Sequence, residues 1–314
     1  MRRIIALVAL LGMLPIFGGC SLFSETYVAV RPHQSSNHNG QTGQQIATSY
    51  HEIYTALSTL IGQAEVSGVI VLSDLSEDVG SSYMQAAVKN VMQQDPVGAF
   101  AVERIDYEIG TNAGRMAAAV QIHYSRSRTD IANIRSVRNI EEAEAVIIQA
   151  LEQASGSVVL RIDQYTKTDF SALTQSCWEQ NPMMIMEIPQ VMAAVYPQSG
   201  QNRLVELTFT YQNSRENLLK MQAMVRPMLT AAELYVQGEP DQQKKFQLLY
   251  TFLMERTDYQ IRRSSVPAYA LLQEGVGDCE AFAFIYAAMC KQAGLECRAI
   301  TGLKDGESWT WNRV

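Results

Sequence analysis

Apolar positions recur at helical spacing from Ser49 onward, and the same pattern returns about ninety residues later at Asn139. Ser49 with Glu52, and Asn139 with Glu142, have the spacing of a capping box, in which two side chains satisfy backbone N–H groups at a helix start. Apolar residues three and four positions apart then form one stripe along each segment. The stripes are Ile53, Ala56, Leu57, Leu60 and Ile61 in the first segment, and Ala143, Val146, Ile147, Ala150 and Leu151 in the second. The pattern predicts two similar amphipathic helices.

The same order of elements follows each of these helices. A short apolar run, 68–72 in the first copy and 157–162 in the second, predicts a buried strand. Each strand leads into a second helix. These helices stop before Pro96 and Pro182, because the residue before a proline is disfavoured in the helical conformation.

Two further strands close each copy and end near Tyr124 and near Tyr211. We therefore predict an α+β fold in which an αβαββ unit is duplicated in tandem over residues 49–213. The copies span about 49–126 and 139–213. Two ordinary α+β segments that are alike by coincidence are the alternative.

The motifs of the duplicated region indicate no chemistry. Its sequence has no phosphate-binding loop, zinc motif or dinucleotide fingerprint. Cys177 falls on an apolar helix, where a small buried hydrophobe is more common than a nucleophile. Met183, Met184 and Met186 predict an apolar strand in the core rather than a metal-thioether site. We interpret the region as an interaction or structural module, and we predict no metal and no cofactor.

The first residues have the layout of a secretory signal. Two arginines precede an apolar run, 4–17, that is too short for a comfortable membrane span. Two glycines then stand directly before Cys20. This order resembles a bacterial lipoprotein signal, although Phe17 stands where that family usually has leucine. The resemblance implies cleavage before Cys20 and lipid attachment to it.

On this basis we predict a signal peptide at residues 1–19 and export of the rest of the chain, anchored through lipidated Cys20 at the bacterial cell membrane or envelope. A simple amino-terminal membrane anchor is the alternative. Residues 20–48 are expected to form a flexible tether, because from Arg31 onward they are mostly Gln, Asn, Ser and Gly and can bury little apolar surface.

The charge of the chain argues against nucleic-acid binding, and its cysteine content argues against a disulfide scaffold. The formal net charge is −7 at pH 7, and no basic cluster follows the signal, which argues against a nucleic-acid partner. Four cysteines follow Cys20. They are too few for a disulfide scaffold in a chain of this length, so buried apolar cores must hold the fold.

The part from residue 214 to 314 has a different pattern. Two polar helices, about 214–236 and 240–255, lead into a glycine-containing turn. Asp278 after this turn is a natural helix cap, and Cys279 lies in the first turn of a helix that is apolar on every side. Free N–H groups at such a helix start stabilise a thiolate, whereas the neighbouring Asp278 opposes it.

The order of pieces around Cys279 resembles the cysteine-bearing half of the transglutaminase-like superfamily, relatives of the papain-type cysteine peptidases. In that family a glycine-containing turn leads to the nucleophilic cysteine, a buried helix, a glycine, a strand and a His-x-Trp-Asn strand. The corresponding pieces are Gly277-Asp278-Cys279, the helix to Lys291, Ala293-Gly294-Leu295, Ala299 to Gly302, and Trp311-Asn312. The resemblance covers about a fifth of the chain and implies a partial papain-like α+β domain.

Two departures from the family pattern bear on catalysis. Trp309 stands where the family has its catalytic histidine, and an indole cannot take a proton from a thiol. No histidine follows His123 in the sequence. The sequence also stops at Val314, before the strands that would carry the family's aspartate, so the resemblance implies an incomplete domain.

These departures favour a cell-envelope lipoprotein whose transglutaminase-like domain has lost catalysis and binds a peptide, glycan or envelope protein. Trp309 and Trp311 alternate on one strand and can stack on a sugar or peptide, so they are candidate binding residues together with Asn312. Two alternatives stay open. One is an active cysteine acyltransferase or peptidase with Cys279 as nucleophile, and the other is a truncated gene product.

The thiols allow further alternatives. Cys279 is either a nucleophile, an idle thiol or half of a disulfide. Cys279 and Cys290 lie on one helix, roughly 16 Å apart along its axis, and cannot bond each other. A turn separates Cys290 from Cys297, and a disulfide between these two stays open.

Overall fold

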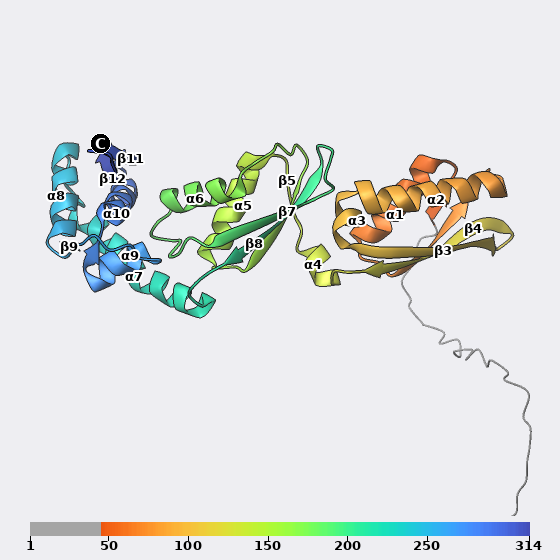
Figure 1. Ribbon diagram of the computed structural model, residues 1–314, viewed down its shortest axis with the longest axis horizontal. Helices are drawn as coiled ribbons and strands as arrows, with labels where there is room; N and C mark the ends of the chain where they lie inside the picture. Colours follow the sequence, from red (N-terminus) through yellow and green to blue (C-terminus); the bar gives the residue numbers. More distant parts are fainter. Residues whose placement is uncertain (1–44) are drawn as a thin grey trace, which may run out of the picture. The chain divides into compact units, whose positions relative to one another are not determined.

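The computed structural model describes residues 45–314, drawn in colour in Figure 1. The predicted signal peptide, Cys20 and most of the predicted tether therefore lie outside the described residues. Within the described part, no helix is long and apolar enough to cross a membrane. Three clusters of buried apolar side chains organise this part into two similar modules and a C-terminal domain.

The first module packs helices against one face of a four-stranded sheet (Figure 1). The strand order is β1-β2-β4-β3, in which β1 is parallel to β2 and the other neighbours are antiparallel. The strands are β1 (Gln45–Ala47), β2 (Ser67–Leu72), β3 (Val102–Asn112) and β4 (Arg115–Tyr124). The helices are α1 (Tyr50–Gly62), α2 (Glu77–Gln94) and α3 (Pro96–Ala101).

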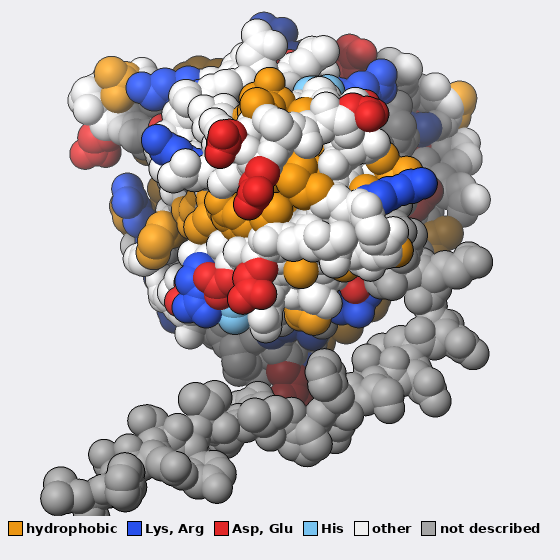
Figure 2. All heavy atoms as spheres, turned by 90° about the vertical axis from the view of Figure 1, so that its right-hand side faces the viewer, with side chains coloured by type: hydrophobic (Ala, Val, Ile, Leu, Met, Phe, Trp, Pro, Cys, Tyr) orange, Lys and Arg blue, Asp and Glu red, His pale blue; other side chains and the backbone are white. Residues whose placement is uncertain are grey.

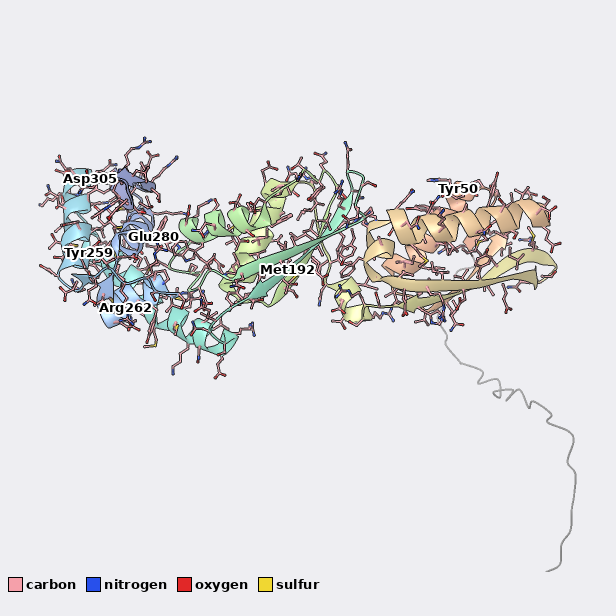
Figure 3. The ribbon with its side chains drawn as sticks, in the orientation of Figure 1. Tyr50, Met192, Tyr259, Arg262, Glu280 and Asp305 are labelled. Carbon is pink, nitrogen blue, oxygen red and sulfur yellow. The ribbon has the colours of Figure 1, made fainter. Side chains whose placement is uncertain are left out.

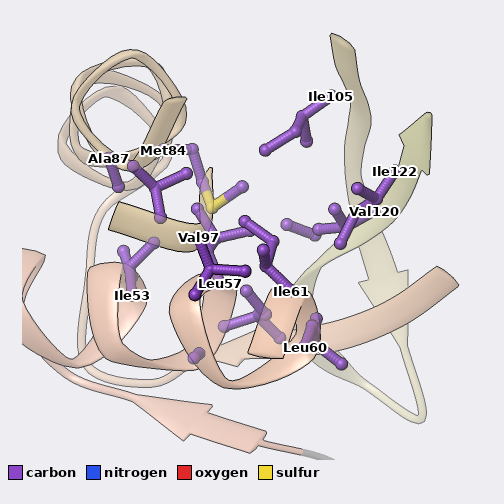
Figure 4. Close-up of a cluster of buried hydrophobic side chains, with 14 of the residues drawn as sticks. Ile53, Leu57, Leu60, Ile61, Met84, Ala87, Val97, Ile105, Val120 and Ile122 are labelled. Carbon is purple, nitrogen blue, oxygen red and sulfur yellow. The ribbon is translucent and has the colours of Figure 1, made fainter. Parts of the chain in front are cut away.

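The apolar stripe of α1 forms the centre of this module's core. Ser49 caps the helix by accepting a hydrogen bond from the N–H of Glu52 at 3.3 Å. Figure 4 shows α1, α2 and strand side chains meeting in one cluster, which includes Ile53, Leu57, Ile61, Met84, Val120 and Ile122. Burying each Ile or Leu side chain contributes about 1.5–3 kcal/mol. Figure 2, which looks onto the first module, shows hydrophobic side chains in a band with acidic and basic ones interspersed.

The second module has the same topology. Its sheet has the order β5-β6-β8-β7, with β5 parallel to β6 and the other neighbours antiparallel. The strands are β5 (Arg135–Val137), β6 (Ser157–Ile162), β7 (Gln190–Tyr196) and β8 (Arg203–Thr210). The helices are α5 (Ile140–Glu152) and α6 (Phe170–Gln180), and the short helix α4 (Arg128–Ala132) before β5 buries Ile131 in the core of the first module. Asn139 caps α5 by accepting from the N–H of Glu142 at 3.0 Å.

The predicted α+β class is confirmed, and the matching sheet orders agree with a repeated unit, although descent by duplication stays a prediction. Each unit begins with a short strand that the sequence did not indicate, so the unit is βαβαββ rather than αβαββ. The first of these strands, β1, lies inside the segment 20–48 predicted to be a flexible tether. That prediction is wrong for residues 45–47, because backbone pairing with β2 orders them.

The predicted strand at Met183–Met186 is also wrong. These residues form turns after α6. Met183 and Met186 are nonetheless buried, at 2% and 3% exposure, because they pack into the apolar cluster of the C-terminal domain. Their apolar character reflects this contact and not a place in the sheet.

The C-terminal domain surrounds one central helix, α10. Its helices are α7 (Arg215–Tyr235), α8 (Gln242–Met254), α9 (Pro267–Tyr269), the π-helical turn η1 (Ala270–Glu274) and α10 (Cys279–Gln292). Its strands are β9 (Asp258–Tyr259), β10 (Val276–Gly277), β11 (Arg298–Lys304) and β12 (Glu307–Arg313). β9 pairs with β10 in parallel, and β11 with β12 antiparallel. Ile285, Met289 and Cys290 of α10 are buried against α7 and α8, which confirms the predicted central helix.

Specific contacts join the second module to this domain. Glu187, only 3% exposed, accepts hydrogen bonds from the backbone N–H groups of Gln212 and Asn213 and from the Asn213 side chain. The Trp178 ring of α6 meets the Phe284 ring of α10 edge to face, with centroids 4.9 Å apart. These contacts fix the start of α7 and cover one side of α10.

Candidate functional site

The turn before α10 places Cys279 at the first position of the helix. Gly275 has a φ of +77° and ends η1, a backbone conformation that favours glycine. A Cβ on Gly277 would lie 2.9 Å from the end of the Leu271 side chain, so a larger residue there would require Leu271 to shift. The Asp278 carboxylate accepts a hydrogen bond from the N–H of Ala281 at 3.0 Å and caps α10. The predicted cap and the predicted position of Cys279 are confirmed.

Acidic groups and a phenol surround Cys279. Asp278 and Glu280 flank it in the sequence, and Tyr259 is close enough to feel the charge of both Cys279 and Asp278. The pKa of Tyr259 is raised, mainly by loss of hydration and then by these negative groups. The pKa of Glu280 is raised by burial and by Asp278, and the Arg263 guanidinium partly offsets this. The residues next to Cys279 in the sequence are therefore acidic, and none of them is a histidine.

A cavity of about 260 Å³ lies next to this helix start. Its lining includes Asp278, Glu280, Arg262 and Arg263, and Trp178 closes it from the second module. Figure 3 labels Tyr259, Arg262 and Glu280 on the C-terminal domain. The cavity can admit a small group that carries hydrogen-bond donors and acceptors.

The β11–β12 hairpin places the remaining candidate residues. Asn312 donates a hydrogen bond from Nδ2 to the backbone carbonyl of Ala283 at 2.7 Å, which ties β12 to α10. Thr310 is buried. Trp309 and Trp311 lie on the other face of the strand, because alternate residues of a strand point to opposite sides. Thus the two indoles share a face, as predicted, whereas Asn312 is bonded to α10.

Trp309, at the family's histidine position, contacts a cation and cannot act as a general base. The Lys304 ammonium lies 4.7 Å from the centroid of the Trp309 ring, a cation–π arrangement. The nearest histidine in the sequence, His123, is in the first module, where Nε2 lies 3.0 Å from the Asp106 carboxylate. Within the described part of the chain, no group of three or more His, Cys, Asp or Glu residues could hold a metal ion.

Cys290 and Cys297 form a pair of free thiols across the turn after α10. Interaction between the two thiols raises the pKa of Cys290 and lowers that of Cys297. Burial adds to the effect on Cys290. Cys177 is fully buried as predicted, and burial raises its pKa to about 11.

Several residues of the site carry no signal in the sequence. Tyr259 lies in a segment, 257–259, that resembles the family's lead-in, but its closeness to Cys279 depends on the parallel pairing of β9 with β10, which spacing does not reveal. Trp178 lies about a hundred residues before Cys279. Glu280 is the exception, since a carboxylate in the first turn after a capping aspartate could have been noted from the sequence.

The arrangement defines the class of the C-terminal part: an α+β domain with a cysteine at the start of its buried central helix. Residues 230–314 match the family model of the transglutaminase-like superfamily. The C-terminal part of the chain is therefore a transglutaminase-like domain, and the resemblance drawn from Gly277-Asp278-Cys279 and Trp311-Asn312 is confirmed.

Comparison with other proteins adds a distant likeness. A crystal structure of a "putative protease" from Parabacteroides distasonis is similar at 10% sequence identity, with a TM-score of 0.21. The similarity covers 78% of this chain and 39% of that one. This chain thus spans well under half the length of that protein. No curated protein matches the chain.

Proposed function

We propose that the chain is a cell-envelope lipoprotein whose transglutaminase-like domain binds a ligand without turning it over. The observation that carries the proposal is the setting of Cys279. Its thiol has Asp278, Glu280 and Tyr259 as neighbours, and a tryptophan stands at the family's histidine position.

Thiol catalysis needs a base that removes the thiol proton and an acid that returns one to the leaving group. An indole supplies neither. In a thiol enzyme a nearby imidazolium stabilises the thiolate and the developing oxyanion, and here the sequence neighbours Asp278 and Glu280 are acidic instead. The helix start at Cys279 supplies favourable N–H groups, but Asp278 already accepts one of them, from Ala281. We infer that the helix start alone does not activate the thiol.

A turnover assay tests the loss of catalysis. The purified mature protein would be given a glutamine-containing peptide with a fluorescent amine, and a general peptide substrate, beside a Cys279→Ala variant. We expect no turnover above that of the variant. Cys297→Ala is a matched control, since it removes a thiol of the same domain outside the site. Turnover that Cys279→Ala abolishes and Cys297→Ala spares would reject the proposal.

An active cysteine acyltransferase or peptidase is the second candidate. One observation favours it: Cys279 is the first residue of a capped, buried helix, which is where a thiol nucleophile is best placed. This candidate requires a base from a partner protein. Turnover that appears only when envelope extract is added, and that depends on Cys279, would support it.

The anchor is supported by the apolar run 4–17 and the two glycines before Cys20. Labelling with a radioactive fatty acid in bacterial cells tests it. We expect label on the wild-type chain and none on Cys20→Ser, with the wild-type chain in the membrane fraction. Wild-type chain without label would reject lipidation.

A further inference from the structure

The β11–β12 hairpin has one face opposite the side that packs on α10. Directly paired residues of two strands share a face, and so do alternate residues along each strand. The observed register therefore collects one set of side chains on a single face: Arg298, Ile300, Gly302 and Lys304 from β11, with Glu307, Trp309, Trp311 and Arg313 from β12. We call this set the indole face.

The outer edge of the Trp311 indole lies against Gly302. A Cβ added to Gly302 would be 2.6 Å from Cη2 and 3.2 Å from Cζ3 of that ring, so only glycine leaves room for it. Trp311 is still 46% exposed. The ring edge meets β11, and nearly half of the side chain is open to solvent. A flat aromatic surface of this kind suits the C–H face of a sugar ring.

The indole face carries more positive than negative side chains, so it favours an anionic ligand. Arg298 and Arg313 stand directly opposite each other in the register, and like charges in that position destabilise a strand pair. Both are exposed, and neither forms a salt bridge within the part of the chain that the structure describes. Lys304 adds a third positive charge against the single carboxylate of Glu307. An excess of positive charge on this face contrasts with the net charge of −7 of the whole chain.

We propose that the indole face binds an acidic polysaccharide. A sugar ring would stack on the exposed Trp311, and the carboxylate or phosphate groups would pair with Arg298 and Arg313, which relieves the repulsion between these two arginines. The face is about 20 Å long, from the rise of a seven-residue strand, so it suits several linked sugars rather than one. The inference rests on the proposed binding role of the domain and names its ligand class.

Binding measurements on the mature protein test this. The probes are polygalacturonate, which carries carboxylates, a phosphomannan, which carries phosphates, neutral dextran and poly-L-glutamate. Calorimetry and tryptophan fluorescence report binding. We expect one or both acidic polysaccharides to bind, and the one that binds identifies the anionic group that is recognised. We expect much weaker binding of dextran and polyglutamate.

The variants separate the platform from the charges. Trp311→Ala and Gly302→Ala should each weaken binding at least about fivefold, the second because its Cβ displaces the ring. Arg298→Gln should weaken binding and flatten its salt dependence. Leu303→Ala is the matched control, since Leu303 is 78% exposed on the opposite face of the same hairpin. It should bind like the wild type.

Unchanged affinity in both Trp311→Ala and Gly302→Ala would overturn the inference, as would polyglutamate binding as tightly as the polysaccharides, or no binding at all. Thermal unfolding of each variant shows that it is folded, and Gly302→Ala keeps every aromatic side chain. The series is repeated in Cys279→Ala. If the wild type turns over a substrate and still binds the glycan, the proposed function is wrong and this inference stands. If the wild type shows neither turnover nor glycan binding, this inference is wrong and the proposed loss of catalysis stands.

Discussion

Removal of the Glu187 carboxylate should destabilise the junction between the second module and α7. Glu187 is 3% exposed, and it accepts hydrogen bonds from the N–H of Asn213 at 3.1 Å, from Nδ2 of Asn213 at 2.8 Å and from the N–H of Gln212. Hydrogen bonds to a charged group contribute about 1.5–3 kcal/mol each to stability. Gln212 is exposed, so water can replace the carboxylate at its N–H. We therefore expect Glu187→Ala to cost about 2–4 kcal/mol, less than the three bonds together.

The free energy of unfolding, from urea denaturation followed by circular dichroism at pH 7, measures this cost. Glu187→Gln should cost less, about 1–2 kcal/mol, because one acceptor oxygen is kept. Asn213→Ala combined with Glu187→Ala should show a coupling of about 1 kcal/mol, since the Asn213 side-chain amide donates one of the hydrogen bonds to Glu187. Glu108→Ala, at an exposed glutamate of β3, is the control and should stay within about 0.5 kcal/mol. A cost for Glu187→Ala no larger than this control would refute the reasoning.

Other predictions follow from ionisable groups. Because the folded-state pKa of Glu280 is raised, its proton is held more tightly than in the unfolded chain, and its contribution to stability falls as pH rises through that pKa. Glu280→Gln should therefore raise Tm at pH 7, and this gain should vanish below about pH 4. A gain in Tm that stays the same across this pH range would contradict the prediction. Cys177 should resist a thiol reagent at pH 8 until the protein unfolds, because burial raises its pKa to about 11, and mass spectrometry of the labelled peptides would expose early labelling. Cys297 should alkylate faster than Cys290, because the pKa of the Cys297 thiol is lowered and that of the Cys290 thiol is raised, and the reverse order would contradict this.

Helix starts and the cysteine turn could be predicted from the sequence because their causes are local. Ser49 and Asn139 cap helices through side chains three residues from the N–H groups that they satisfy. Gly275 and Gly277 leave backbone freedom directly before Cys279, and Asp278 caps the helix that follows. A pattern of a few residues contains the whole interaction in each case.

The features that the sequence did not indicate depend on distant partners. Strand β1 has three residues in a polar context, and only its pairing with β2 makes it a strand. Met183 and Met186 are apolar because they meet the C-terminal core, so their composition suggested a strand that does not form. Periodicity reports that a side chain is buried, and it does not report which surface buries it.

The same distinction bears on the candidate site. The sequence identified Trp309 and Trp311 as a pair on one face. The register of the hairpin adds two features that spacing could not give: Gly302 lies against the edge of the Trp311 indole, and Arg298 faces Arg313. A stretch selected only for folding would gain stability by replacing one of these arginines with an acidic residue. The repulsion between Arg298 and Arg313 and the exposure of the Trp311 ring both lower the stability of the fold, and these residues lie together on the indole face. A ligand that offsets both costs at once accounts for them more simply than two unrelated defects.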